Sequence, residues 1–277
     1  MTIKCLGYRG LFNSTERIEQ EFIRRGWTLS DKPDLIYHAN GFFDDAEAFY
    51  DQCITKPIRI YNLLDIPPHI EGWPVEKTKE QLSRAEVVTT ISEHVAVQMN
   101  EILGINPYVN YFPMRPVKQI NIPRDQKYLY VGRVFDSNKR VDLLSGFRGV
   151  TVATTQPFHY NKCIFCPSDE KLSELYSSHQ FTFLPSKYEG IGLTAVEAVI
   201  CGSYPVLCND NPAVKTFDLQ PFAADPTTDA LLKKVEEIEK NKDYYETIRK
   251  SLVDSFISKF SLERVVERII NLYNNTK

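Results

Sequence analysis

Short apolar runs alternate with amphipathic segments along the first half of the chain, and this rhythm predicts alternating strands and helices. The apolar runs predicted as strands are residues 2–8, 34–39, 57–64, 86–91 and 107–112. The amphipathic segments predicted as helices are residues 13–25, 43–52, 75–84 and 92–103. Repeated strand–helix units predict a parallel sheet with helices on both of its faces.

The second half repeats this alternation after a break. Residues 113–126 carry three prolines and no hydrophobic period, which is typical of an interdomain linker. Beyond it, strands are predicted at residues 127–134, 150–155, 162–166, 180–185 and 204–208. Helices are predicted at residues 138–147, 168–178, 192–201, 227–240, 242–256 and 262–274. The expected fold class is therefore α/β, with two doubly wound domains in sequence and a cleft between them.

Length, charge and cysteine content narrow the kinds of function that this chain can have. A chain of 277 residues has room for about two domains. Its net charge of −3 disfavours a dedicated nucleic-acid binder, which usually has a basic excess. The sequence has neither a signal-peptide pattern nor an apolar stretch of about 18 residues, and a cytoplasmic location is expected. The six cysteines are then expected to be reduced, and the pair Cys163 and Cys166 is interpreted as part of a buried strand rather than a zinc site.

The first candidate site follows the predicted strand at 180–185. There the sequence PSKYEGIGLTAVEA begins at Pro185, with Glu189 on a glycine loop and Glu197 about two turns into the next helix. Ligands of open α/β sheets bind beyond the carboxyl ends of the strands. A helix N-terminus favours a phosphate group, and carboxylates accept hydrogen bonds from hydroxyls. Each glutamate taken singly also fits a solvated surface position.

The second candidate site follows the predicted strand at 127–134. The sequence VGRVFDSNKR places Gly132 and Arg133 at the end of this strand and Lys139 at the start of the next helix. A guanidinium group can form two hydrogen bonds to phosphate oxygens, and an ammonium group supplies a compact positive charge. The alternative is a solvated helix start that carries surface cations.

These two motifs resemble those of the retaining GT-B glycosyltransferases of family 4. The resemblance rests on two glutamates separated by seven residues, Glu189 and Glu197, and on Gly132-Arg133 with Lys139 six residues after the arginine. It extends to SDEKLSELYSSHQFTFLPS and to the terminal FSLERVVERIINLY, so it covers the second half of the chain, whereas the first half matches only in its strand–helix rhythm.

The resemblance implies two doubly wound Rossmann-like domains that face each other across a cleft. The expected boundaries are an acceptor-side domain at 1–115, a linker at 116–126, a nucleotide-sugar-binding domain at 127–260 and a terminal helix at 261–277 that crosses back to the first domain.

The same resemblance implies a metal-independent enzyme that needs no cofactor and takes a UDP- or GDP-linked sugar as its donor substrate. Arg133 and Lys139 would hold the diphosphate, and Glu189 would bind the sugar hydroxyls near the reacting carbon. Glu197 would bind the ribose hydroxyls. The donor-binding backbone positions would be Gly132, Gly190, Ile191, Gly192 and Leu193, together with Gly10 in the loop at 7–11.

The first half departs from the family in one respect. Many relatives carry a histidine and an aspartate after the third strand, whereas this chain has YNLLD at residues 61–65 without a histidine. Asp65 and His38 are candidate contacts to the sugar or the acceptor, and His69 is a further substitute. The alternatives are a turn residue for Asp65 and structural or surface histidines for the other two.

Three functions remain open from the sequence. The first is transfer of a sugar to a glycan, lipid-linked or protein-linked acceptor, with peripheral membrane association if the acceptor is a lipid. The second is a phage-type enzyme that acts on DNA bases in a host cytoplasm. Residues 1–115 hold 12 Lys and Arg against 16 Asp and Glu, and this acidic balance disfavours nucleic acid as a partner. The third is a catalytically degenerate sugar-nucleotide-binding subunit of a larger transferase.

Overall fold

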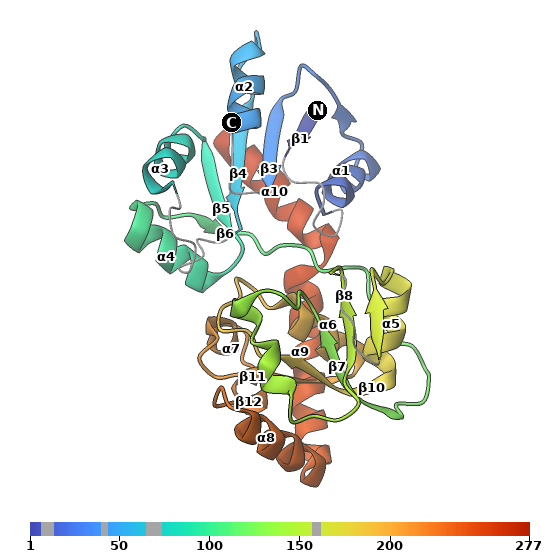
Figure 1. The fold of residues 1–277 in the computed structure, drawn as a ribbon. Helices are drawn as coiled ribbons and strands as arrows, with labels where there is room; N and C mark the ends of the chain where they lie inside the picture. The colour runs from blue at the N-terminus through green and yellow to red at the C-terminus, as the bar shows by residue number, and fades with distance from the viewer. Residues whose placement is uncertain (7–13, 40–43, 65–73, 157–161) are drawn as a thin grey trace. The chain divides into compact units, whose positions relative to one another are not determined.

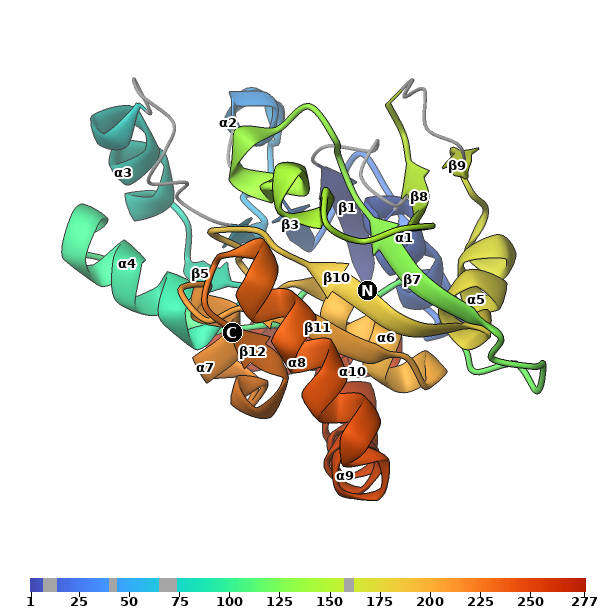
Figure 2. The ribbon, with the colours of Figure 1, turned by 60° about the horizontal axis from the view of Figure 1, so that its bottom comes forward.

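The computed structural model describes residues 1–6, 14–39, 44–64, 74–156 and 162–277. These residues form two compact units. Unit 1 consists of residues 1–113 and 259–277, and unit 2 consists of residues 114–258. Each unit contains a six-stranded sheet in which every pair of neighbouring strands is parallel (Figures 1 and 2). The expected pair of doubly wound, Rossmann-like α/β domains is confirmed.

The sheet of unit 1 has the strand order β2-β1-β3-β4-β5-β6. Its strands are β1 (Thr2–Leu6), β2 (Thr28–Leu29), β3 (Leu35–Ala39), β4 (Ile58–Leu63), β5 (Val87–Thr90) and β6 (Tyr108–Val109). The helices of this unit are α1 (Ser14–Arg24), α2 (Asp44–Gln52), α3 (Val75–Ser83), α4 (Glu93–Leu103) and α10 (Leu262–Thr276). Gly104 ends α4 in a left-handed conformation with φ 69°, as the sequence predicts.

The terminal helix α10 completes the core of unit 1. Its buried residues Val265, Val266, Ile269 and Tyr273 recur at helical spacing and form one apolar stripe. The Tyr273 ring packs edge-on against Trp27, with 5.3 Å between the ring centroids. Arg25 at the end of α1 donates a hydrogen bond to the Glu263 carbonyl at 2.8 Å. Residues from both ends of the sequence therefore share one core.

The sheet of unit 2 has the order β12-β11-β10-β7-β8-β9. Its strands are β7 (Gln126–Val131), β8 (Thr151–Thr154), β9 (Cys163–Phe165), β10 (His179–Leu184), β11 (Tyr204–Cys208) and β12 (Ala223–Ala224). The chain leaves β7 toward one edge of the sheet and returns to β10 on the other side of β7. The strand order therefore reverses between β7 and β10, and such a switch point is where ligands bind in open α/β sheets.

The α-helices of unit 2 lie close to the expected positions, except α7, which was not predicted. They are α5 (Asp169–Ser178), α6 (Leu193–Cys201), α7 (Pro212–Thr216), α8 (Thr228–Lys240) and α9 (Lys242–Phe260), the last of which runs past the boundary into unit 1. The Ser168 hydroxyl accepts a hydrogen bond from the Lys171 amide and caps α5. No helix in the described part of the chain has the length and apolar character needed to cross a membrane.

The helix predicted at residues 138–147 does not form. Two 3₁₀ helices, Ser137–Lys139 and Val141–Leu144, stand in its place. Arg140 lies between them in the left-handed region with φ 46°, which a continuous right-handed helix does not permit. Its guanidinium group forms two hydrogen bonds with Asp210, at 2.9 and 2.6 Å. This long-range ion pair stabilises the strained residue and accounts for the interruption.

The prediction of a buried strand at residues 162–166 is wrong about its burial. A strand does form, but β9 is the outermost strand of its sheet and has β8 as its single strand neighbour among the described residues. Cys166 is exposed, and 58% of the Phe165 surface is accessible. The apolar pattern of this segment resembles that of a central strand, and its place at the edge depends on topology.

Candidate active site

The two loops singled out in the sequence begin at adjacent strand ends. Tyr130 in β7 and Phe183 in β10 are direct partners in the parallel register, and both strands end within two residues of this pair. Gly132 and Arg133 follow β7, and the loop that carries Glu189 follows β10. The Thr194 hydroxyl, in the first turn of α6, donates to the Val131 carbonyl at 3.4 Å. The two motifs therefore meet at the switch point of unit 2.

Asn138 ties the two loops together. Its side-chain nitrogen donates to the Tyr188 carbonyl at 2.9 Å, and its side-chain oxygen accepts from the Tyr188 amide at 3.0 Å. The Asn138 carbonyl accepts from the Lys187 amide at 2.8 Å. These three hydrogen bonds hold Lys139, which follows Asn138, next to Glu189, which follows Tyr188.

The residues brought together in this way are Lys139 and Glu189. The Lys139 ammonium group donates a hydrogen bond to a Glu189 carboxylate oxygen. Only 16% and 17% of the two side chains are exposed, so water screens this pair less than it screens a surface ion pair. A cation suited to phosphate and a carboxylate suited to sugar hydroxyls thus occupy one point of the site.

Arg133 lies on a loop with fixed backbone and an exposed side chain. The Tyr130 hydroxyl donates to the Arg133 carbonyl at 2.6 Å, and the Gln156 side-chain oxygen accepts from the amides of Val134 and Phe135 at 2.7 and 3.0 Å. The Arg133 guanidinium is 61% exposed and pairs with Asp136 at 2.7 Å. Its charge can therefore reorient toward a ligand.

Glycine is required at two positions of these loops. A side chain on Gly132 would place its first carbon 2.8 Å from the Tyr130 hydroxyl oxygen. Gly192 has φ 75° and precedes the first residue of α6, Leu193. Ile191 is buried, and Leu193 begins α6, so the backbone amides of the first turn of α6 are the groups that this segment can offer to a ligand.

Glu197 does not join the other predicted residues. Its side chain has no exposed surface, and both of its carboxylate oxygens contact protein donors. Arg115 donates through Nε at 2.9 Å and also through Nη2, and the Tyr176 hydroxyl donates at 2.9 Å. Burial and the neighbouring Glu197 carboxylate raise the pKa of Tyr176, so its hydroxyl stays protonated and can donate.

Of the candidate site residues in unit 1, the structure describes only His38. The His38 side chain is buried at the carboxyl end of β3, and its Nε2 lies 2.8 Å from an Asp45 carboxylate oxygen. The hydrogen bond from His38 is the main reason that the pKa of Asp45 is lowered. Gly10, Asp65 and His69 lie outside the described residues.

Comparisons with known proteins agree with this geometry. Residues 160–252 match the family Glycosyl transferases group 1. O-antigen chain mannosyltransferase B from Escherichia coli is 26% identical over 235 residues, which cover 68% of this chain and 60% of that protein. Residues 160–252 are therefore similar to the group 1 glycosyl transferases.

Solved structures support the fold. HepE from Anabaena, crystallised with UDP-glucose, superimposes with a TM-score of 0.74 at 13% identity over 99% of this chain and 98% of that one. Sucrose-phosphate synthase from Thermosynechococcus elongatus superimposes with a TM-score of 0.68 at 15% identity over 96% of this chain and 79% of that one. These likenesses confirm the expected GT-B fold.

The sequence reasoning missed several residues that hold the site residues or Glu197 in place. Asn138 lies next to Lys139, and an asparagine in a short turn was the available signal. Gln156 and Arg115 gave no such signal, because their partners are about 20 and 82 residues away in the sequence. Within the described part of the chain, no three His, Cys, Asp or Glu residues are grouped so as to hold a metal ion.

Proposed function

We propose that this chain transfers a sugar from a nucleotide-sugar donor to an acceptor hydroxyl, with retention at the anomeric carbon and without a metal ion. The observation that carries the proposal is the meeting of Arg133, Lys139 and Glu189 at the switch point of unit 2. The HepE structures contain UDP-glucose or UDP, and the curated relative is named a mannosyltransferase. The HepE complexes support a UDP-linked sugar as the donor, and a GDP-linked sugar is the alternative to be tested.

The proposed reaction separates charge at the anomeric carbon. Its bond to the diphosphate oxygen breaks, the electron pair leaves with the diphosphate, and the acceptor oxygen forms the new bond on the same face. The acceptor proton passes to the departing phosphate oxygen. Arg133, Lys139 and the amides at the start of α6 are arranged to stabilise the negative charge of the leaving group. Preorganised electrostatic stabilisation of this kind contributes several kcal/mol to a transition state.

The cations of the proposed site are paired in the unliganded chain. Arg133 contacts Asp136, and Lys139 contacts Glu189. A bound diphosphate would take over both cations and release the two carboxylates. Glu189 would then be available to accept hydrogen bonds from the donor sugar, whereas Glu197, which is fully buried, would not reach the ribose.

A thermal-shift screen followed by a transfer assay tests the proposal. The wild-type protein is mixed with UDP-, GDP-, ADP- and CMP-sugars, with and without Mg²⁺, because a ligand that binds only the native state raises the melting temperature. We expect one nucleotide class to raise it, and Arg133→Ala to abolish that rise. Sugar release should be lost in Glu189→Ala, with its melting temperature near that of the wild type.

The alternatives predict different results. A nucleotide-dependent shift with neither transfer nor hydrolysis would indicate a degenerate binding subunit. Full transfer activity in Glu189→Ala or Arg133→Ala would refute the assignment of the site.

A further inference from the structure

Phe135 is an exposed aromatic residue on the loop that carries Arg133. Its accessible fraction is 68%, and the same loop continues to Asn138 and Lys139. Single exposed apolar side chains are common on protein surfaces, so exposure alone assigns no role to this ring. What distinguishes Phe135 is its fixed backbone and its place along the strand ends of unit 2.

The backbone at Phe135 is held to the end of β8. The Gln156 side-chain oxygen accepts hydrogen bonds from the amides of Val134 and Phe135, at 2.7 and 3.0 Å. The Gln156 amide in turn donates to the Thr154 hydroxyl at 3.1 Å, and Thr154 is the last residue of β8. The loop after β7 is therefore tied to the neighbouring strand at the point where Phe135 lies.

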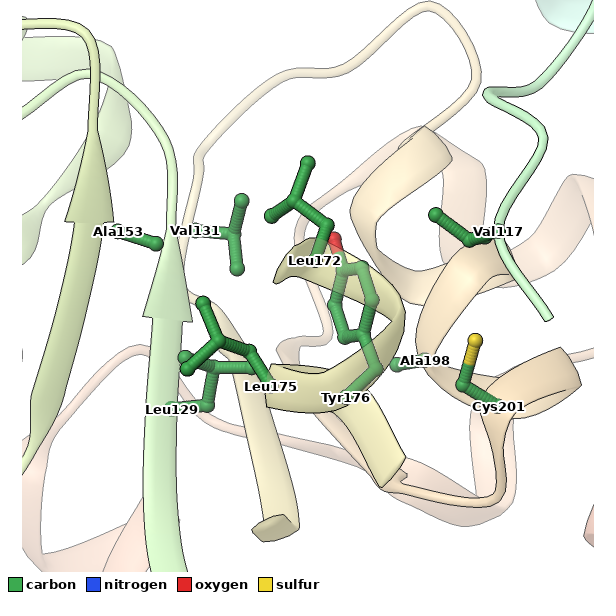
Figure 3. Packing of buried hydrophobic residues seen from close by; sticks show 9 residues of the cluster. All are labelled: Val117, Leu129, Val131, Ala153, Leu172, Leu175, Tyr176, Ala198 and Cys201. Carbon is green, nitrogen blue, oxygen red and sulfur yellow. The ribbon is translucent and has the colours of Figure 1, made fainter. Parts of the chain in front are cut away.

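The strand ends that support this loop are packed into the core. Val131 of β7 and Ala153 of β8 are partners in the parallel register, and both belong to the buried apolar cluster shown in Figure 3. The Gly132 amide donates to the Ala153 carbonyl at 3.0 Å. The segment from Arg133 to Phe135 thus begins at a rigid strand end. A ring presented from a fixed backbone loses little conformational freedom when a ligand binds against it.

The sheet order places Phe135 on the β8 side of the proposed diphosphate site. Glu189 follows β10, Arg133 follows β7, and Gln156, which holds Phe135, follows β8. These strands are neighbours in the order β10-β7-β8. Their ends therefore present groups suited to a sugar, a diphosphate and a planar ring in turn. A nucleotide-sugar carries its sugar, diphosphate and nucleoside in the same sequence.

We propose that Phe135 stacks on the nucleobase of the donor. This inference rests on the proposed function, in which Arg133 binds the diphosphate. Phe135 lies two residues beyond Arg133, so their Cα atoms are at most about 7 Å apart. A base that is joined to the diphosphate through ribose can then lie against the ring. Every base has a π face, so Phe135 selects nucleotides as a class and does not distinguish uracil from guanine.

Ribose 5-diphosphate, which lacks a base, provides a readout specific to stacking. Calorimetry would compare its affinity with those of UDP and GDP on the wild type and on Phe135→Ala. Removal of an aromatic platform typically weakens base binding by about fivefold to a hundredfold, so Phe135→Ala should lose UDP or GDP affinity by that factor. Its affinity for ribose 5-diphosphate should stay within about twofold of the wild-type value, because no base is present to stack.

Three further variants separate stacking from general effects. Phe135→Tyr keeps the ring and should bind UDP or GDP like the wild type, whereas Phe135→Leu keeps apolar bulk without a π face and should lose most of the affinity. Tyr244→Ala is the matched control, because Tyr244 is another exposed aromatic residue of unit 2. Glu246, two residues later on α9, accepts from the hydroxyl of Tyr204, the first residue of β11, so Tyr244 lies toward the opposite edge of the sheet. This control should leave all three affinities unchanged.

Each outcome decides between the stacking role and the proposed function. Unchanged affinity for UDP and GDP in Phe135→Ala, or an equal loss of affinity for ribose 5-diphosphate, overturns the stacking role and leaves the transferase assignment standing. A Phe135→Ala protein that binds nucleotides like the wild type but has a raised KM for the acceptor assigns the ring to the acceptor, and this too overturns stacking. A wild type that binds neither UDP nor GDP overturns the proposed function and the stacking role together.

Discussion

The side chain of Asn138 forms a reciprocal pair of hydrogen bonds with the main chain of Tyr188, one donated and one accepted. This pair joins two loops that are separated by fifty residues in the sequence. It sets the distance between Lys139 and Glu189, which follow Asn138 and Tyr188 directly. The geometry of the site therefore depends on a residue that has no role in the proposed chemistry.

Asn138→Ala should loosen the site without abolishing nucleotide binding. The change removes two side-chain hydrogen bonds, each worth about 1 kcal/mol, and leaves the Asn138 carbonyl in place. We expect transfer to fall by roughly tenfold to a hundredfold, since a small misplacement of reacting groups is costly. Asn138→Asp keeps the hydrogen bond from the Tyr188 amide and should lose less transfer activity than Asn138→Ala. The transfer rates of both variants would be measured by steady-state kinetics. Rates equal to that of the wild type would contradict the role of Asn138 in holding Lys139 and Glu189 together.

Lys139→Met should abolish most transfer activity. It removes a fixed cation from the leaving group, and the loss of one such stabilising group typically reduces the rate by about a hundredfold or more. Lys187→Met is the matched control, because Lys187 lies on the same loop as Glu189 and is exposed. Initial rates of sugar release at saturating donor would be compared. Equal losses in the two lysine variants would point to a general effect of charge rather than to a catalytic role.

Asp136→Asn should strengthen nucleotide binding. Asp136 pairs with Arg133 at 2.7 Å, and its other oxygen accepts from the Asn138 amide at 3.0 Å. The amide retains this second bond, so the turn is preserved while Arg133 loses its competing anion. Exposed ion pairs contribute about 0.2–1 kcal/mol, which corresponds to a severalfold gain at most. Calorimetric titration with UDP or GDP measures this gain in affinity. Weaker binding in Asp136→Asn would contradict the proposal that Arg133 leaves Asp136 for the diphosphate.

His179 should make unit 2 less stable in mild acid. It is buried at the start of β10, with Nδ1 2.7 Å from the Leu175 carbonyl and Nε2 3.0 Å from the Thr151 hydroxyl. Burial lowers the pKa of His179 below its ordinary value of 6.5. As the pH falls below 6.5, the unfolded chain therefore takes up a proton before the folded chain does.

The free energy of unfolding should then decrease with falling pH, by up to about 1.4 kcal/mol per pH unit for this one group. The decrease begins near pH 6.5 and ends at the lower pKa of the folded state. Urea denaturation of the wild type and of His179→Asn, at pH 7.5 and pH 5.5, isolates the contribution. The wild type should lose more stability across this interval, and identical losses would exclude His179 as the cause.

Local pattern was sufficient for much of the fold and for part of the site. The end of β10 could be predicted because its apolar run stops at Pro185, and α6 because Gly192 and Gly202 flank an apolar helical stretch, whereas β7 ends three residues before the predicted residue 134. The interruption at Arg140 could not be predicted, since its partner Asp210 lies on a distant loop. The burial of Glu197 was equally invisible, because Arg115 reaches it from a segment that resembles a linker.

Unit 1 is built from the two ends of the chain, and this has a consequence for biosynthesis. Trp27 lies between α1 and β2 and is synthesised about 250 residues before Tyr273, the ring that packs against it. At about 5–20 residues per second, roughly 10 to 30 s pass between completion of residue 113 and the appearance of α10. Unit 2 can fold within this interval, while the apolar surface around Trp27 is not yet covered by α10. The core of unit 1 can therefore be completed only after residues 259–277 have been added, when unit 2 has already been synthesised.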